Sequence, residues 1–207
     1  MQTYRLKPHP TTPALDVSGI SVTMMRLMGG ELLLRYRINQ AAKVVVPRGF
    51  AHRSEEDLWR RTCLEFFVYD QNGRYREFNF APAGDWAAFK FASYRKRAGD
   101  YVPEVSPQID FQRGPQVITV TVRLPARVLD GVSSASLCAV IEEEGGHHSL
   151  WSMAHRRDEP DFHDPMSFAI RFAMPGFAQA RARKYSCSRR MISMFRLASA
   201  IWVRCAP

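Results

Sequence analysis

The sequence predicts an all-β protein, an antiparallel β-sandwich of the jelly-roll or immunoglobulin-like kind with about ten or eleven strands. Three observations indicate this class. Short runs alternate apolar and polar residues at hairpin spacing, and Gly, Pro and Asn turn signals separate the runs. Up to residue 175, no apolar pattern supports a helix longer than a turn or two, which is typical of sandwiches and barrels.

The expected elements follow one another with short connections. Residues 3–7 alternate only weakly and predict a first edge strand, and Gly29-Gly30 marks a hairpin turn. Helical turns are expected at 54–57, where a Ser precedes three acids, and at 125–129. The remaining strands are expected at 17–28, 31–39, 43–46, 85–93, 102–111, 117–124, 137–142, 147–154 and 166–172.

The strongest hairpin signal lies within residues 57–80, where two alternating runs flank Gln71-Asn72-Gly73. A two-residue turn would pair Glu65 with Phe80, whereas a three-residue loop with a left-handed Gly73 pairs Glu65 with Asn79. Because a one-residue slip inverts every side chain, the register that keeps one apolar face is favoured, which is the second one. That register sends Leu64, Phe66, Val68, Phe78 and Phe80 one way and Glu65, Tyr69, Tyr75, Glu77 and Asn79 the other.

The charge of the chain is unevenly distributed. Seven of the 29 basic residues and no acid follow Pro175, so residues 1–175 carry 22 basic against 20 acidic residues. The basic total therefore gives no reason to expect nucleic-acid binding by the folded body. We expect a sandwich domain over 1–175 and a basic extension over 176–207, either disordered or a short amphipathic helix that contacts anionic membrane. No secretory signal or membrane-spanning run is seen, which favours a cytoplasmic protein.

Candidate ligand-binding residues combine indole rings with polar groups. Glu65 is opposite Asn79 in the favoured register, Trp86 is expected on the equivalent face of the next strand, and Trp151 shares a face with His155. Indoles stack on the apolar side of a sugar ring, while carboxylates and amides bind its hydroxyls. The ordinary alternative is that the tryptophans belong to the core, but a carboxylate such as Glu65 in an apolar strand needs a partner or water.

Other kinds of chemistry have weaker support. No nucleophile elbow, phosphate loop, dinucleotide fingerprint or cysteine–histidine signature occurs, so we do not expect an enzyme. Glu65 and Glu77 could serve as acid and base, but binding a ligand or pairing with Arg61 or Arg76 is the simpler role. The His- and Asp-rich stretch from 147 to 164 lacks metal-ligand spacing, so no metal is expected.

Three blocks of the chain carry a family resemblance: LWRRTCLEFFVYD at 58–70, YREFNFAPAGDWAAFKF at 75–91 and LWSMAHRRDEPDFHDPMSFAIRF at 150–172. Together they resemble the bacterial DOMON-like domain, which is related to carbohydrate-binding module family nine. The resemblance implies a β-sandwich with a site for a sugar or haem. In the sugar-binding relatives two tryptophans clamp the ring and a glutamate shortly after the first holds its hydroxyls.

That pattern maps onto Trp59 and Glu65, with Trp151 as the second wall. Arg76, Asn79 and His155 are looser matches. Our first hypothesis is therefore a non-catalytic module that binds a carbohydrate between Trp59 and Trp151. The alternatives are a haem-binding redox module that uses Met153 or His155, and an interaction domain without a small ligand.

Overall fold

The computed structural model of the protein describes residues 1–46 and 55–172. The expectations for Ser54 and for the extension over 176–207 lie outside the described residues. Residues Met1–Arg171 form one compact unit, which is described here by itself. Among the described residues, no helix has both the length and the hydropathy needed to cross a bilayer.

The described part of the chain is all-β, with twelve antiparallel strands and three short 3-10 helices. The strands run in the order β7-β6-β5-β4-β10-β11-β1-β2-β3-β9-β8, and β12 also pairs with β10. Their bounds are β1 Gln2–Pro8, β2 Gly19–Arg26, β3 Leu32–Asn39, β4 Cys63–Asp70, β5 Tyr75–Phe80, β6 Trp86–Ser93, β7 Lys96–Asp100, β8 Gln108–Arg113, β9 Val117–Leu124, β10 Val132–Glu143, β11 His147–Ser152 and β12 Ile170–Arg171. The helices are η1 Glu55–Arg60, η2 Ala126–Leu129 and η3 Pro165–Ser167.

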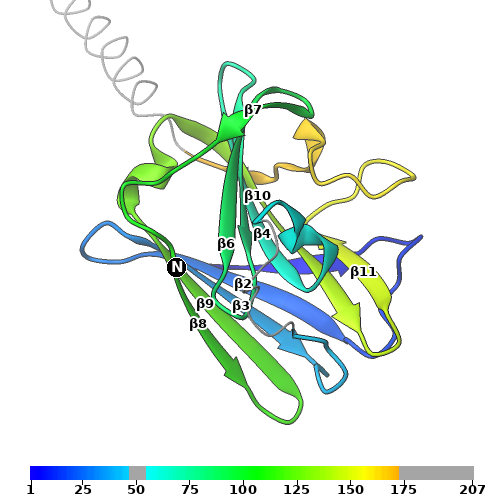
Figure 1. Ribbon diagram of the computed structural model, residues 1–207. Coiled ribbons are helices and arrows are strands. Elements are labelled where there is room, and N and C mark those ends of the chain that lie inside the picture. The colour runs from blue at the N-terminus through cyan, green and yellow to red at the C-terminus, as the bar shows by residue number, and fades with distance from the viewer. Residues whose placement is uncertain (47–54, 173–207) are drawn as a thin grey trace, which may run out of the picture. The chain divides into compact units, whose positions relative to one another are not determined.

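The sheet folds back on itself, so that its two halves face each other across a core. Tyr36 of β3 donates its hydroxyl hydrogen to the backbone oxygen of Glu65 in β4 at 2.8 Å, although four strands separate β3 from β4 in the sheet order. A side chain can make that bond only across the interior. The fold is therefore sandwich-like, as expected, and in Figure 1 the strands β4, β6 and β10 cross the strands β2, β3, β8 and β9.

The central hairpin has the predicted register. Glu65 lies opposite Asn79, Phe67 lies opposite Glu77, and the amide of Asp70 donates to the oxygen of Arg74. Gly73 has a φ of 82°, the left-handed conformation that favours glycine. The turn chemistry and the alternation of this stretch therefore agree, and the prediction of two differently composed faces is confirmed.

The inner face of the hairpin packs in the main core. Its aromatic residues Phe66, Phe78 and Phe80 are fully buried, like Tyr36 on the facing half. The outer face of β4, β5 and β6 is covered as well, because Leu58 of η1 and Phe162 and Phe168 from the segment after β11 pack onto it. The aromatic and polar face is thus a second, smaller core. Its polar members lie between apolar neighbours and not in open solvent.

Several expected elements differ from the structure. The strand expected at 43–46 is reduced to an isolated bridge between Val44 and Glu143, and the one expected at 166–172 is reduced to β12 after η3. The weakly alternating first strand is not at an edge: β1 pairs with β2 through residues Gln2–Leu6 and with β11 through Lys7 and Pro8. A strand that bridges two partners at its two ends has no need of a strongly apolar sequence. Between the strands expected at 85–93 and 102–111, where no strand was expected, the structure has β7, whose side chains are all exposed. The charges on β7 are typical of an edge strand protected from further pairing.

Candidate functional site

The outer face of the second half-sheet contains a pocket with a volume of about 420 Å³, within the range usual for small-molecule sites. Strands β4, β5 and β10 form its floor, β6 and β7 one side, and η1 with the segment after β11 the other. Its lining residues are Trp59, Glu65, Glu77, Phe89, Phe91, Arg95, Arg97, Val140, Leu150, Pro160, Phe162 and His163. We call it the outer-face pocket. Its composition, aromatic rings around two carboxyls, is that of a site for a small polar ligand with apolar faces.

The floor carries three oxygen-bearing side chains. Glu65 is 3% exposed and Glu77 is 6% exposed, while Asn79 is completely enclosed. Asn79 Nδ2 donates to Glu77 Oε1 at 2.8 Å, but Asn79 Oδ1 is buried without a hydrogen-bond partner among the described residues. The Glu65 carboxyl lies opposite Asn79 and also accepts no hydrogen bond there. A buried acceptor without a donor is costly, and among the described residues this applies to Asn79 Oδ1. Glu65 and Glu77 line the pocket itself and can accept hydrogen bonds from a ligand.

The two carboxyls influence each other's ionisation. Burial, and then repulsion from Glu77, raises the pKa of Glu65 well above its usual range. Burial also raises the pKa of Glu77, although its bond from Asn79 and the charges of Arg97 and Arg95 oppose that rise. Neighbouring buried carboxyls cannot both ionise easily in a low-dielectric site. Without a ligand, the pair therefore tends to retain a proton.

Aromatic rings form the sides of the pocket. Trp59 of η1 is 48% exposed, and the guanidinium of Arg60 lies 5.0 Å from the centre of its ring. Phe91 stacks on Tyr75, with ring centres 4.5 Å apart and planes 3° from parallel. These rings present apolar surface at the sides of the polar floor, which is the arrangement that binds the two kinds of surface on a sugar.

His163 enters the pocket from the segment after β11 and is neutral there. Its Nδ1 lies 2.9 Å from the hydroxyl oxygen of Tyr75, and its ring meets Phe67 and Phe91 edge-on. Burial, with help from the Arg95 charge, lowers the pKa of His163 to about 4. The 3.7 Å separation of His163 Nε2 from Glu77 Oε2 is therefore not an ion pair near neutral pH.

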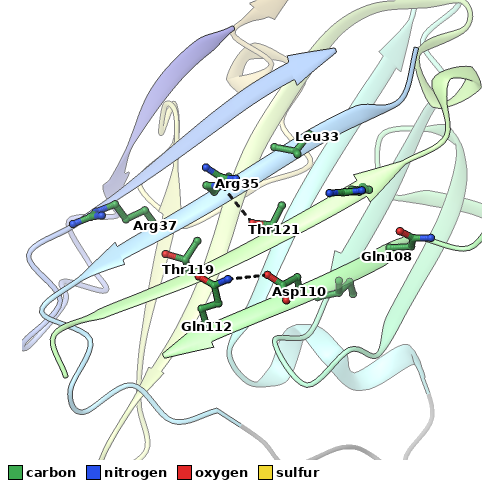
Figure 2. Close-up of a pocket in the computed structure, with 10 residues that line it drawn as sticks. Leu33, Arg35, Arg37, Gln108, Asp110, Gln112, Thr119 and Thr121 are labelled. Atoms are coloured by element: carbon green, nitrogen blue, oxygen red, sulfur yellow. Dashed lines mark hydrogen bonds between the residues drawn. The ribbon is translucent and has the colours of Figure 1, made fainter. Parts of the chain in front are cut away.

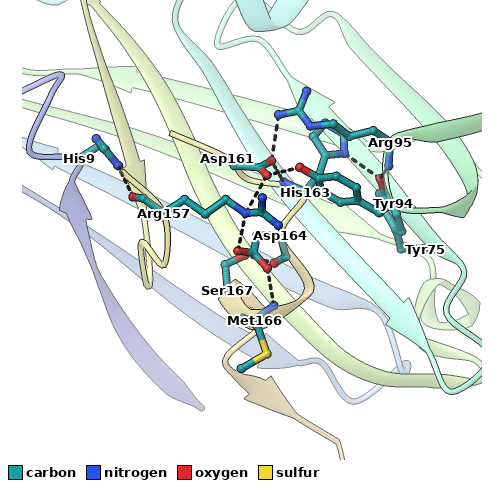
Figure 3. A network of polar contacts seen from close by, with 10 residues as sticks. All are labelled: His9, Tyr75, Tyr94, Arg95, Arg157, Asp161, His163, Asp164, Met166 and Ser167. Atoms are coloured by element: carbon teal, nitrogen blue, oxygen red, sulfur yellow. Dashed lines mark hydrogen bonds and ion pairs between the residues drawn. The ribbon is translucent and has the colours of Figure 1, made fainter. Parts of the chain in front are cut away.

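A polar network holds the segment that supplies Phe162 and His163 (Figure 3). Asp161 accepts hydrogen bonds from Tyr94 at 2.6 Å and from Arg95 at 2.9 Å, which ties the segment to the turn between β6 and β7. Arg157 donates to Asp164 at 2.9 Å, and the Asp164 carboxylate accepts from the amide of Met166 at the start of η3. This wall of the pocket is thus positioned by charge-assisted bonds.

The structure brings together only part of the set of predicted site residues. Trp59 and Glu65 line the outer-face pocket, and Asn79 lies in its floor. Trp151 does not line it. In the β4–β10–β11 register Trp151 shares a row with Ala139 and Leu64, so it points to the main core on the opposite side of the sheet from Glu65. It is 2% exposed, and its Nε1 donates to the hydroxyl of Ser149. The expectation of Trp151 as the second wall is corrected accordingly.

Trp86 and Arg76 are also on the opposite side from Glu65. Trp86 pairs with Phe80, an inner-face residue, because the β5–β6 register places Ala87 beside Asn79. Arg76 donates to the backbone oxygen of Val128 at 2.9 Å, and its guanidinium lies 4.8 Å from the centre of the Tyr101 ring. Neither residue can therefore share a site with Glu65. The anticipated partner Arg61 pairs instead with Glu142.

His155 lies outside the pocket, near the end of β1. Its Nε2 is 2.9 Å from the backbone oxygen of Lys7, and its ring packs edge-on against His9 at 4.7 Å. To ligate haem iron through Nε2, His155 would have to give up the contact with Lys7. Within residues 1–46 and 55–172, no group of three or more His, Cys, Asp or Glu side chains is placed to hold a metal ion.

Several lining residues were not anticipated as site residues. Phe89 and Phe91 share a face in the sequence pattern, but only the β5–β6 register places them beside Glu77 and Tyr75. Arg95, Phe162 and His163 come from connections whose position no local pattern determines. Glu77 could have been found, because the favoured hairpin register already places it on the face of Glu65.

Another hollow lies on the outer face of the other half-sheet (Figure 2). Its side chains come from β3, β8 and β9 and include Arg35, Arg37 and Arg123 beside Thr119 and Thr121. Arg35 Nε donates to the Thr121 hydroxyl at 3.4 Å. No aromatic ring lines this hollow. It therefore offers hydrogen bonds and positive charge but no surface on which a sugar ring could stack.

Comparison with known proteins supports the fold. No family model matches the chain, and no curated protein sequence matches it. The fold is similar to the crystal structure of a proposed carbohydrate-binding protein from Bacteroides uniformis ATCC 8492, with a TM-score of 0.58 and 20% sequence identity. The similarity covers 81% of this chain and 84% of that chain. At this identity, the likeness shows a shared all-β architecture.

Proposed function

We propose that this protein is a non-catalytic carbohydrate-binding module and that the outer-face pocket is its binding site. The observation that carries the proposal is the Glu65 carboxyl, which is almost fully buried at the floor of a pocket with aromatic sides and has no hydrogen-bond donor among the described residues. Sugar hydroxyls would supply donors to Glu65. Trp59 and the phenylalanines would contact the apolar side of the ring.

The likeness to a proposed carbohydrate-binding protein supports the same class of ligand. The site proposed here differs from the two-tryptophan clamp suggested by the family resemblance. One exposed indole, Trp59, remains, with Phe162 on the same side of the pocket, and the opposite side is formed by Phe89 and Phe91. Binding should therefore depend on Trp59 and Glu65 and should be insensitive to residues of the other half-sheet.

Isothermal titration calorimetry and affinity electrophoresis with mono-, di- and polysaccharides test the proposal. For the sugar that binds best, Trp59→Ala should weaken binding by about 2 kcal/mol, roughly thirtyfold, if the indole is an anchor. Arg35→Ala, in the hollow of Figure 2, is the matched surface control and should leave the affinity unchanged. Trp86→Phe, on the inner side of β6, controls for the loss of an indole.

Two results would reject the proposal. A panel of sugars in which none binds would remove the function altogether. If Trp59→Ala binds the sugar as tightly as the wild type and Arg35→Ala binds it more weakly, the binding site lies on the other half-sheet.

A further inference from the structure

We propose that the outer-face pocket selects a sugar that carries a protonated amino group, so that its ligands are amino sugars and not neutral sugars. This inference rests on the proposed function and names the ligand class of the same site. It starts from the floor of the pocket, where the carboxyls of Glu65 and Glu77 line the surface and the enclosed Asn79 Oδ1 lies beneath it without a donor among the described residues.

The register explains why these oxygens gather. Glu65 and Asn79 are directly opposite each other in β4 and β5, and Glu77 follows Asn79 two residues away on the same face. Cross-strand and diagonal neighbours of this kind are within reach of each other. The one internal donor, Asn79 Nδ2, is used by Glu77 Oε1 at 2.8 Å. Asn79 Oδ1 and the Glu65 carboxyl have no donor among the described residues.

The surrounding charged and titratable groups do not neutralise Glu65. The thiols of Cys63 and Cys138 lie on the same face as the Glu65 side chain, and the phenol of Tyr36 reaches the Glu65 backbone oxygen from the main core. All three groups have raised pKa values and stay neutral. His163, from the segment after β11, is neutral above a pKa of about 4. Tyr75 of β5, with a pKa of about 12, is neutral as well.

The two arginines that line the pocket have acidic partners of their own. Arg95 pairs with Asp161 at 2.9 Å. Arg97 pairs with Asp100 at 2.6 Å and lies 4.2 Å from the centre of the Phe89 ring. Both arginines lower the pKa of Glu77, but the pKa of Glu65 is affected only by burial and by Glu77. Among the described residues, the Glu65 carboxyl is therefore buried without a paired countercharge.

An ammonium group on the ligand suits this floor better than a hydroxyl does. It brings three N–H donors and one positive charge, whereas a hydroxyl brings one donor and no charge. A cation close to both carboxyls favours their ionised forms. The aromatic rings at the sides also attract an organic cation. A bare metal ion would leave these rings unused, and a sugar ring would cover them.

Proton release is the distinctive consequence of this mechanism. Burial raises the pKa of both carboxyls, and a cation bound between them would lower both pKa values again. Binding of an ammonium group should therefore release protons from the pair. Calorimetry at pH 6, where an alkylamine is fully protonated, should therefore give different apparent enthalpies in buffers of different ionisation enthalpy. A neutral sugar, which does not require ionisation, should give the same enthalpy in each buffer.

The experiment is a matched titration of the full-length protein. Glucosamine, galactosamine and mannosamine are compared with glucose, galactose and mannose and with the three N-acetyl derivatives. We expect at least one amino sugar to bind ten or more times tighter than its neutral parent and to release protons, and we expect N-acetylation to remove the preference. Glu65→Gln should reduce the preference to threefold or less, and Arg35→Ala should preserve it. If Glu65→Gln does not fold, Glu77→Gln is tested in its place, after circular dichroism has shown that it folds, and should reduce the preference in the same way.

The outcomes separate the two proposals. If a neutral sugar binds as tightly as its amino counterpart, or if no protons are released, the amino-sugar inference is wrong and the carbohydrate-binding function stands. A preference that survives in both glutamine variants also overturns the inference. If none of the nine sugars binds, and polysaccharides do not bind either, the proposed function fails and this inference fails with it.

Discussion

His163 should make the protein lose stability as the pH falls from about 6.5 to about 4. A histidine that is buried in the neutral form has a lower pKa in the folded protein than in the unfolded chain, so acid favours unfolding. Here burial among Phe67, Tyr75 and Phe91 lowers the pKa from 6.5 to about 4. The stability contributed by the neutral ring is complete above pH 6.5 and is lost as the pH falls through this window.

The size of the effect follows from the shift. Each pKa unit corresponds to about 1.4 kcal/mol, so proton uptake by the unfolded chain lowers the free energy of unfolding by about 2 kcal/mol at pH 5 and about 3 kcal/mol at pH 4. The His163→Gln variant lacks this proton-binding group. It will be less stable at pH 7, because the contact with Tyr75 changes, but its stability should depend less on pH.

Urea unfolding of the wild type and the His163→Gln variant, followed by tryptophan fluorescence at pH 7, 6, 5 and 4, measures this difference. The other acid-sensitive groups are common to both proteins and cancel in the comparison. The expected result is two curves of unfolding free energy against pH that converge by about 3 kcal/mol between pH 7 and pH 4. Parallel curves, or an imidazole NMR resonance that titrates near 6.5, would refute the reasoning.

Two further predictions concern the floor of the pocket and the tryptophans. The Glu65→Gln variant should gain stability relative to the wild type as the pH rises above about 4.5. The reason is that the pKa of Glu65 is higher in the folded protein than in the unfolded chain, so the wild type loses stability as the pH rises through the folded-state pKa. Urea unfolding at pH 4 and pH 8 measures the trend, and a constant difference between the free energies of unfolding of the two proteins would contradict it. Trp151→Ala should lower the free energy of unfolding by about 3–5 kcal/mol, whereas Trp59→Ala, at 48% exposure, should change it by about 0.5 kcal/mol. Similar losses in the two alanine variants would mean that the two indoles are not buried differently.

Local patterns in the sequence determine the fold class and the geometry of the central hairpin. A left-handed Gly73 and a strict alternation on both sides of it leave one register in which the apolar residues share a face. Glu65, Glu77 and Asn79 therefore had to lie on the other face. Since a strand has a period of two, this part of the site depends only on residues that are close in the chain.

The choice of tryptophan could not be predicted in this way. Whether Trp151 points to the pocket or to the main core depends on its register with Ala139, a residue of a different strand, and a shift of one position would have reversed the answer. The same holds for Trp86, whose side is set by its partner Phe80. The alternation within each strand indicates which residues share a face but not which face is covered.

The sequence by itself determined the fold class, most of the strands, the central hairpin and the acidic face that the pocket uses, because turn chemistry and a two-residue period act over short distances. It did not predict β7. Only the tertiary structure decided what covers that face. Arg95 and Asp161 join two distant connections at 2.9 Å, and this contact places Phe162 and His163 over Glu77. Burial then raises the carboxyl pKa values, so the chemistry of the floor arises from packing between segments that are far apart in the chain.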